Sequence, residues 1–185
     1  MNAANVVTLS RIALIPVIVG LYYSGLPYSN ALATAVFIIA SVSDWLDGYL
    51  ARKLNQASEF GAFLDPVADK LLVVVILILL VTQHGNLLLA TSIIIAREIL
   101  VSALREWMAA QGKRATVAVA FSGKLKTTVQ MIAIGALLLV DDGTPVILWQ
   151  FGFVLVNLAA LLSLWSMFQY FNKAWAVLFP PSSRE

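Results

Sequence analysis

The chain has 185 residues, of which 61% are hydrophobic and only 12% are charged. Soluble globular domains carry about 25% charged residues, so this composition excludes an ordinary soluble domain and indicates an all-α integral membrane protein. The net charge of +2 is too small to predict a nucleic-acid partner, and we interpret the slight basic excess as facing membrane lipid or an anionic substrate. Because cysteine is absent, disulfide and thiol chemistry are excluded.

The N-terminal stretch carries Asn5, Thr8 and Arg11 three residues apart, which places them on one face of a helix. We expect a short amphipathic segment here that lies at the membrane interface and leads into the first span. A signal peptide is the alternative, but the flank is only weakly basic and no small-residue cleavage site follows the apolar run.

Six apolar stretches then follow one another along the chain, separated by short polar turns and connectors. A hydrocarbon core about 30 Å thick needs about 20 helical residues, so with modest tilt these stretches predict six transmembrane helices in one domain covering residues 1–185. The expected spans are about 12–23, 31–44 or 31–50, 63–81, 87–108, 125–140 and 146–170.

Two starts are open for the third of these helices. Asp65 followed by Pro66 suits an N-cap with proline at the first helical position. Gly61 also suits the start of the helix, and Pro66 would then lie inside it as a kink.

The basic residues predict the orientation of the helices. The three turns at 24–30, 82–86 and 141–145 contain no Lys or Arg. The basic residues that fall at the opposite ends of the spans are Arg52, Lys53, Lys113, Arg114, Lys124, Lys126, Lys173 and Arg184. By the positive-inside rule, both termini and the segment 44–69 are cytoplasmic.

The segment 44–69 holds four of the six aspartates of the chain. Asp44 and Asp47 are three residues apart and Asp65 and Asp69 are four apart, so each pair presents two carboxylates on one helical face. If these faces meet, the clustered anions repel one another in a low-dielectric surrounding unless cations neutralise them. Oxygen ligands of this kind select Mg²⁺ or Mn²⁺ first and Ca²⁺ less well.

Four clustered aspartates in a membrane protein are consistent with two classes of function. One is a metal-dependent enzyme, and the other is a divalent-cation transporter whose aspartates line an ion path. The aspartates fall at the cytoplasmic ends of the second and third spans rather than at mid-depth, and Arg52 would repel a passing cation. These two features favour the enzyme.

Between Asp44 and Asp69 the sequence reads Asp-x2-Asp-Gly-x2-Ala-Arg-x8-Gly-x3-Asp-x3-Asp. This pattern resembles the signature of the CDP-alcohol phosphotransferases at all eight specified positions. The resemblance implies a membrane enzyme that moves a phosphate-linked group from a CDP-alcohol to a second alcohol and releases CMP. It also implies a six-helix transmembrane fold, a site near the cytoplasmic surface and a homodimer.

The resemblance assigns the metal and the base. Asp44, Asp47, Asp65 and Asp69 would hold the divalent ions, Mg²⁺ or Mn²⁺, which we expect to be two in number. Asp69 would also be the general base that takes the proton of the acceptor hydroxyl.

The resemblance also implies a binding site for the CDP-alcohol. Gly48 has no side chain, so a ligand can approach the backbone beside it, and Arg52 one turn later is a planar donor suited to a phosphate. The full set of residues implied in this site is Asn5, Thr8, Gly48, Arg52, Ser58 and Gly61.

A phosphorylated acceptor would need a basic pocket. Arg97 and Arg105 are eight residues apart and so share one helical face. Arg97 lies well inside a span, where a charge is costly, so it is either functional or paired. The alternative partners that would make it merely structural are Glu98, Glu106 and the aspartates of the segment 44–69.

Lys124 and Lys126, at the start of the fifth span, would complete this pocket. Their alternative role is ordinary anchoring at the cytoplasmic surface.

A closer resemblance within the family is carried by FGAFLDPVADKLLV, IIAREILVSALREWMA, SGKLKTTVQM and LWSMFQY. It implies CDP-diacylglycerol as the donor and sn-glycerol 3-phosphate as the acceptor, in a bacterial inner membrane. Relatives whose acceptor is inositol phosphate, serine or phosphatidylglycerol share the same eight-residue signature, so those acceptors stay open.

Overall fold

The structure is a computed structural model that describes the backbone of residues 3–54, 59–113, 116 and 121–179. Within these ranges, the side chains outside the description are those of residues 3–7, 44–54, 59–60, 62–63, 65, 121–122 and 124. Regular structure in the described chain is entirely helical, which confirms the expected all-α class.

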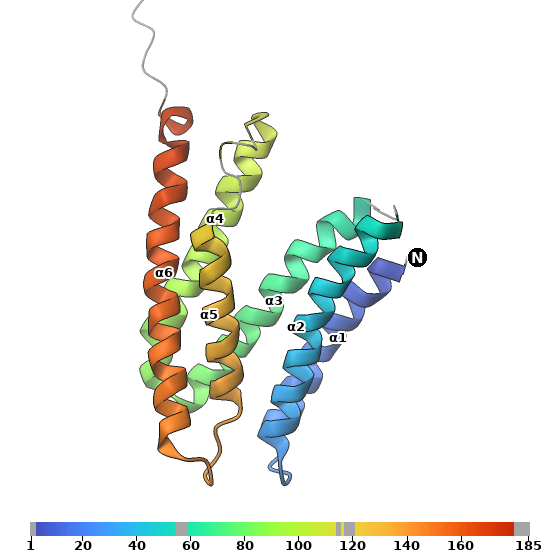
Figure 1. Ribbon diagram of the computed structural model, residues 1–185, viewed down its shortest axis with the longest axis vertical. Coiled ribbons are helices and arrows are strands. Elements are labelled where there is room, and N and C mark those ends of the chain that lie inside the picture. Colours follow the sequence, from blue (N-terminus) through green and yellow to red (C-terminus); the bar gives the residue numbers. More distant parts are fainter. Residues whose placement is uncertain (1–2, 55–58, 114–115, 117–120, 180–185) are drawn as a thin grey trace, which may run out of the picture.

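Six α-helices and one short 3-10 helix make up the described chain (Figure 1). They are α1 (Ala3–Tyr23), α2 (Ser29–Leu54), α3 (Glu59–Gln83), η1 (Gly85–Leu87), α4 (Leu88–Ala110), α5 (Phe121–Leu138) and α6 (Val146–Leu178). The turns that follow α1, α3 and α5 lie toward one end of the bundle, whereas α2 and α4 end, and α3 and α5 begin, toward the other. This alternation is the one that the distribution of basic residues predicts.

Within the described residues, three stretches are long and apolar enough to cross a membrane: Pro66–Gln83, Gly85–Ala110 and Val146–Leu178. Shorter apolar stretches occur in the other three α-helices, at Thr8–Tyr23, Ser29–Ser43 and Leu125–Leu138. The protein is therefore a helical membrane protein, and the crossing of all six helices stays a prediction.

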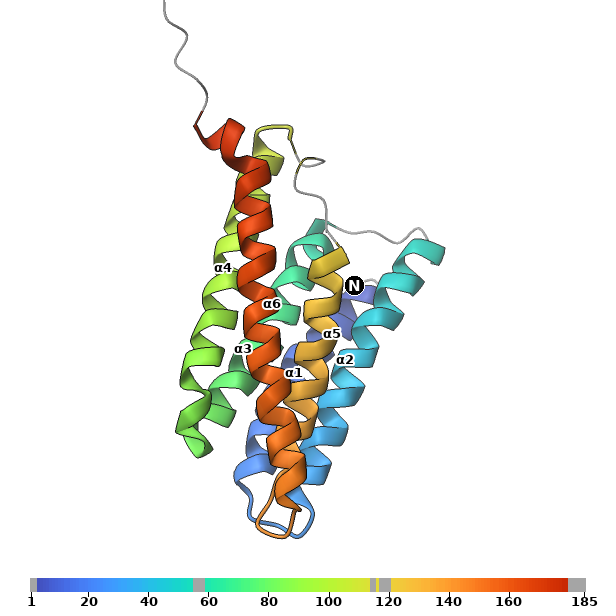
Figure 2. The same ribbon diagram turned by 60° about the vertical axis from the view of Figure 1, so that its left-hand side comes forward.

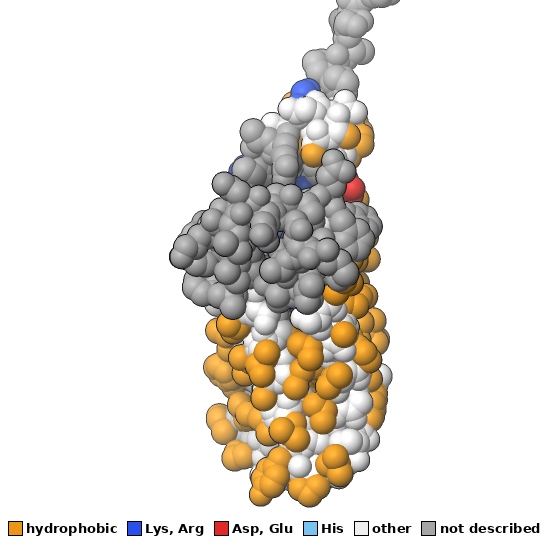
Figure 3. All heavy atoms as spheres, turned by 90° about the vertical axis from the view of Figure 1, so that its right-hand side faces the viewer, with side chains coloured by type: hydrophobic (Ala, Val, Ile, Leu, Met, Phe, Trp, Pro, Cys, Tyr) orange, Lys and Arg blue, Asp and Glu red, His pale blue; other side chains and the backbone are white. Residues whose placement is uncertain are grey.

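α6 buries small residues and exposes large apolar ones. Gly152, Ala159 and Ser163 are buried, whereas Leu161 and Phe168 are 64% and 69% exposed. Figure 3 shows a comparable outer surface on another face, where hydrophobic side chains cover the lower part of the molecule. Small residues allow close helix approach and lipid solvates the large ones, as is typical of membrane bundles.

α1 is one continuous helix, so the expected interfacial segment is not a separate element. Thr8 and Arg11 are 0% and 1% exposed, so the described part of its polar face points into the bundle. The physical reason is a partner of opposite charge, because Arg11 forms an ion pair with Asp69 of α3. Spacing along one helix correctly grouped these residues but did not predict what they face.

α3 begins at Glu59, upstream of both starts that the sequence left open. Asp65 is therefore not an N-cap, and Pro66 lies inside the helix. Proline at this position lacks the N–H that would bond the carbonyl four residues earlier. Membrane helices tolerate such a loss where neighbouring groups satisfy the freed carbonyl.

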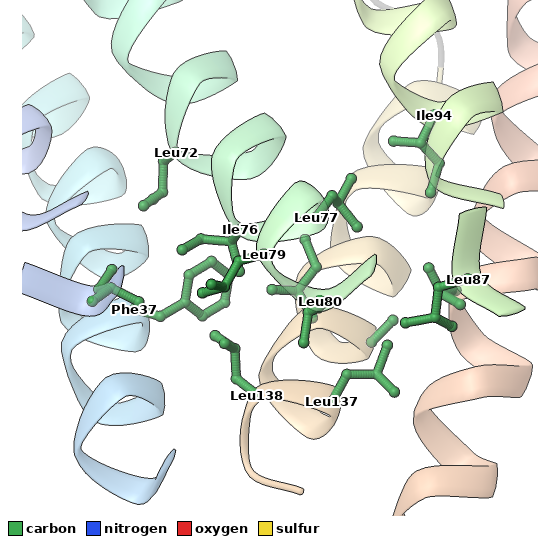
Figure 4. Close-up of a cluster of buried hydrophobic side chains, with 14 of the residues drawn as sticks. Phe37, Leu72, Ile76, Leu77, Leu79, Leu80, Leu87, Ile94, Leu137 and Leu138 are labelled. Atoms are coloured by element: carbon green, nitrogen blue, oxygen red, sulfur yellow. The ribbon is translucent and has the colours of Figure 1, made fainter. Parts of the chain in front are cut away.

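α3 also occupies the centre of the hydrophobic core (Figure 4). Its residues Ile76 and Leu80 lie between Phe37 of α2 on one side and Leu87 and Ile94 on the other. All five of these side chains are at most 2% exposed. α3 thus joins the α1–α2 pair to the group formed by α4, α5 and α6.

α5 and α6 run side by side in both ribbon views (Figure 2) and pack closely at Gly152. A Cβ atom added to Gly152 would lie 2.7 Å from Cγ of Leu137 on α5. Leu137 is itself fully buried, so it is enclosed on all sides. Gly135 of α5, by contrast, has no atom within 4 Å of an added Cβ.

We expect Gly152→Ala to lower the free energy of unfolding by about 1–3 kcal/mol, because the new methyl group overlaps Leu137. Gly135→Ala is the matched control, since it gains helix propensity in open space and should be neutral or stabilising. Thermal unfolding of both variants in one detergent measures the difference. Equal melting temperatures would contradict the close packing.

Candidate active site

A cavity of about 440 Å³ lies among the six α-helices, each of which contributes to its wall. Its volume is in the range of about 300–1,000 Å³ that is usual for small-molecule sites. Its polar lining includes one residue from each helix, in chain order Arg11, Ser41, Asp69, Arg97, Gln130 and Tyr170. Asp69 and Arg97, both predicted as site residues from separate spans, therefore share one cavity.

Asp69 of α3 forms the acidic side of the cavity. Its carboxylate accepts a hydrogen bond from Nη1 of Arg11, whose side chain is 1% exposed on α1. The Asp69 side chain remains 45% exposed and lines the cavity. Because a guanidinium is a rigid planar donor, Arg11 orients the carboxylate while burying its own charge against it.

Three of the four predicted metal ligands, Asp44, Asp47 and Asp65, have side chains outside the described set. Their helices are described, and Asp44 and Asp47 lie about one turn apart on α2, as do Asp65 and Asp69 on α3. Among the described side chains, no group of three or more potential metal ligands occurs. The one described ligand, Asp69, fits a hard divalent cation, because its carboxylate is partly exposed at the cavity wall.

Arg97 of α4 forms the basic side of the cavity. Its Nε and Nη2 atoms donate to Oγ of Ser166 on α6 at 3.2 and 3.0 Å. Its Nη1 lies 3.5 Å from Oε2 of Glu98, and its guanidinium carbon lies 5.8 Å from the ring centroid of Tyr170. The alternative role of Arg97, pairing with Glu98, is thus observed, but Arg97 lines the cavity as well. Both are compatible because a guanidinium has five donors.

Lys126 of α5 is 1% exposed, and its amine donates to Oε1 of Glu98. It is not among the residues that line the cavity. Glu98 therefore stands between two cations, Lys126 and Arg97, and joins α4 to α5. Direct binding of a phosphate by Lys126 would require it to leave this carboxylate.

Arg105 lies two turns after Arg97 on α4 and lines the same cavity, as the spacing predicts. Its side chain is exposed and forms no ion pair with any other described residue. Its donors are therefore available to a ligand within the described part of the site. Lys70 of α3 also lines the cavity and adds positive charge.

The residues predicted to bind the CDP-alcohol are only partly described. Thr8 is buried on α1 and Gly61 is buried on α3, and neither lines the cavity. The predicted nucleotide and phosphate residues outside the described side chains are Asn5, Gly48, Arg52, Ser58 and Lys124.

The cavity wall includes further residues that the sequence did not predict as site residues, among them Arg11, Glu98 and Gln130. Arg11 had a signal, because its spacing from Thr8 placed it on the polar face of the first helix. The sequence predicts Glu98 only as a partner of Arg97. Gln130 lies one turn after Lys126 in the SGKLKTTVQM stretch, but an uncharged side chain inside a span does not by itself predict a site.

The chain matches the family model described as CDP-alcohol phosphatidyltransferase over residues 1–178. The protein therefore belongs to the CDP-alcohol phosphatidyltransferase family, as its signature indicated, and this family generally uses a divalent metal. It is 48% identical over 181 residues to the CDP-diacylglycerol--glycerol-3-phosphate 3-phosphatidyltransferase of Escherichia coli K12, which covers 96% of this chain and 97% of that protein. The proteins of the same name from Shigella flexneri serotype 5b and Shigella sonnei are equally similar.

Replacing Glu98 by glutamine leaves the Lys126 amine buried without its counter-charge, so we expect a loss of about 3 kcal/mol in the free energy of unfolding. Removing both charges, with Glu98→Gln and Lys126→Met together, should recover much of that loss. Thermal unfolding in detergent compares the single and the double variant.

The control for this pair is Glu106→Gln, because Glu106 is an exposed residue two turns after Glu98 on α4. Its melting temperature should stay close to that of the unmodified protein. A double variant that melts as low as Glu98→Gln alone would contradict the assigned ion pair.

Proposed function

We propose that the protein transfers the phosphatidyl group of CDP-diacylglycerol to sn-glycerol 3-phosphate, which gives phosphatidylglycerol phosphate and CMP. The observation that carries this proposal is that one cavity has the Asp69 carboxylate on one helix and the Arg97 and Arg105 guanidiniums on another. The relatives that are 48% identical to this chain share a name that specifies the same donor and acceptor, which supports the proposal.

The basic side of the cavity suits the phosphate of the acceptor. Glycerol 3-phosphate is a small dianion, and guanidinium groups bind phosphate through paired, charge-assisted hydrogen bonds. In this proposal Arg97 and Arg105 bind the phosphate directly. Lys124 adds positive charge from α5, and Lys126 acts through Glu98, which it holds beside Arg97.

The acidic side of the cavity suits the attacking hydroxyl. The oxygen of that hydroxyl forms a bond to the lipid-side phosphorus of CDP-diacylglycerol, and Asp69 takes the proton that the hydroxyl loses. The bond from this phosphorus to the oxygen that bridges the two phosphates breaks, and CMP leaves with that oxygen. Arg11 keeps the Asp69 carboxylate oriented toward the cavity during this step.

The four aspartates Asp44, Asp47, Asp65 and Asp69 would hold the metal, which we propose to be two Mg²⁺ or Mn²⁺ ions. Bound metal would supply the positive charge that offsets the diphosphate of the donor and the leaving CMP. The proposed contacts of the protein with CDP-diacylglycerol itself are made by Asn5, Thr8, Gly48, Arg52, Ser58 and Gly61.

We further propose that the protein is a homodimer of the bacterial inner membrane with six transmembrane helices. Both termini and the site would be cytoplasmic, where glycerol 3-phosphate is a soluble metabolite. The absence of Lys and Arg from the three turns at 24–30, 82–86 and 141–145 supports this orientation.

The reaction is tested by measuring CMP release from the purified protein in detergent with CDP-diacylglycerol and Mg²⁺. Separate reactions contain sn-glycerol 3-phosphate, inositol phosphate, serine, phosphatidylglycerol or no acceptor. Release that depends on glycerol 3-phosphate and stops on chelation is the expected result. Release with a different acceptor would contradict glycerol 3-phosphate as the acceptor. No release with any acceptor would contradict the enzymatic function and favour a role of the aspartates in ion transport.

Asp69→Asn should abolish turnover, because an amide cannot take the proton of the acceptor hydroxyl. We expect a fall in kcat of at least about a hundredfold. The melting temperature should fall as well, because the buried Arg11 guanidinium loses the counter-charge of Asp69, so kcat is measured at a temperature where the variant is folded. Asp142→Asn is the matched control, since Asp142 is an exposed residue of the turn between α5 and α6. Substantial activity in Asp69→Asn would remove Asp69 from the base role.

Arg105→Ala should raise the KM for glycerol 3-phosphate about tenfold or more while leaving the KM for CDP-diacylglycerol nearly unchanged. The reason is the loss of charge-assisted hydrogen bonds to the acceptor phosphate. Lys113→Ala, which removes an exposed positive charge just after α4, serves as the control. An unaltered KM for the acceptor would contradict the assignment of the phosphate-binding pocket to this side of the cavity.

A further inference from the structure

Gln130 of α5 lies at the cavity wall and is 2% exposed. Its Oε1 atom is buried and accepts no hydrogen bond from any described residue. A buried amide oxygen without a partner is unfavourable, and native proteins retain few of them. Gln130 therefore carries a hydrogen-bonding capacity that the described protein leaves unused.

The other polar groups of α5 next to Gln130 are already engaged. Oγ1 of Thr127 donates to the carbonyl of Gly123 at 2.9 Å, within its own helix. The amine of Lys126 donates to Glu98. Gln130 thus differs from its neighbours in the SGKLKTTVQM stretch, because its acceptor oxygen is buried at the cavity and unpartnered among the described residues.

Three of the helices contribute chemically different groups to the cavity wall. α3 supplies the carboxylate of Asp69, α4 supplies the guanidiniums of Arg97 and Arg105, and α5 supplies the neutral amide of Gln130. A neutral amide cannot balance the charge of a phosphate. It can, however, accept a hydrogen bond from a hydroxyl group through its oxygen.

Glycerol 3-phosphate likewise has three polar parts. Its phosphate needs cations, and its terminal hydroxyl, which attacks the donor, needs a base. Its middle hydroxyl does not react, and an unpaired hydroxyl enclosed in the cavity would be unfavourable. Among the described residues that line the cavity, Gln130 is the one with a buried acceptor oxygen that lacks a partner, so its amide matches this third part.

We propose that Gln130 binds the non-reacting hydroxyl of the acceptor, through a hydrogen bond that this hydroxyl donates to Oε1. This assignment rests on the proposed function and adds to it a residue that determines specificity. An acceptor that lacks the middle hydroxyl leaves the buried amide unpaired, so the site disfavours it. The protein would thereby select a polyol phosphate over a simple hydroxyalkyl phosphate.

The probe for this proposal is 3-hydroxypropyl phosphate, which keeps the phosphate and the terminal hydroxyl and lacks the middle hydroxyl. CMP release gives kcat/KM for this compound and for sn-glycerol 3-phosphate. The unmodified protein should prefer glycerol 3-phosphate by about tenfold or more. In Gln130→Met, which keeps the side-chain length without its hydrogen-bonding groups, the two values should agree within about twofold.

The matched control is Thr91→Val. Thr91 of α4 is 4% exposed and also carries a buried oxygen without a described partner, but it does not line the cavity. This variant should keep the preference of the unmodified protein. A loss of preference in Thr91→Val would show that the effect arises from buried polar groups in general, and it would overturn the assignment.

Two other results would also overturn the role of Gln130 while leaving the proposed reaction intact. The first is equal use of both acceptors by the unmodified protein. The second is an unchanged preference in Gln130→Met, including the case in which kcat/KM falls equally for both acceptors. Gln130→Asn, which withdraws the amide by one methylene, gives a second measurement of the preference if Gln130→Met does not fold. Failure of the unmodified protein to release CMP with either acceptor would instead contradict the proposed function itself.

Discussion

A charge inside an apolar helix bundle needs a partner of opposite charge, and the rest of the site depends on this constraint. The ion pair between Arg11 and Asp69 satisfies it. Arg11 is almost completely buried, and the Asp69 carboxylate of α3 compensates its charge inside the bundle. The ion pair of Lys126 with Glu98 compensates a second buried charge, between α5 and α4. Each pair fixes one helix against another, and both place charge beside one cavity.

The helices could be predicted from the sequence because apolar runs, polar turns and the distribution of basic residues are properties of contiguous segments. Their ends were less predictable. α3 starts at Glu59, before Gly61 and Asp65, and includes Pro66 in its interior. Local signals favoured a later start, but a helix in an apolar bundle is stabilised by packing along its whole length, and this can outweigh one missing hydrogen bond.

The candidate site was predictable where chemistry repeats along one helix. The eight-residue spacing of Arg97 and Arg105 correctly put both on one cavity wall. The burial of Lys126 and the unpartnered oxygen of Gln130 depend on the register of α5 against its neighbours, which periodicity within one helix does not contain. A charged residue inside a span has a large free-energy cost and therefore indicates a functional or paired group, whereas an uncharged residue such as Gln130 gives no such indication.

The most direct test of the proposed site is an experimental structure of the protein with sn-glycerol 3-phosphate bound. We predict that the phosphate lies within hydrogen-bonding distance of Arg97 and Arg105, that one hydroxyl faces Asp69, and that Lys126 remains paired with Glu98. A phosphate bound outside this cavity would contradict it. So would a bound acceptor whose hydroxyl groups all point away from Asp69, because the two sides of the cavity would then not serve one reaction.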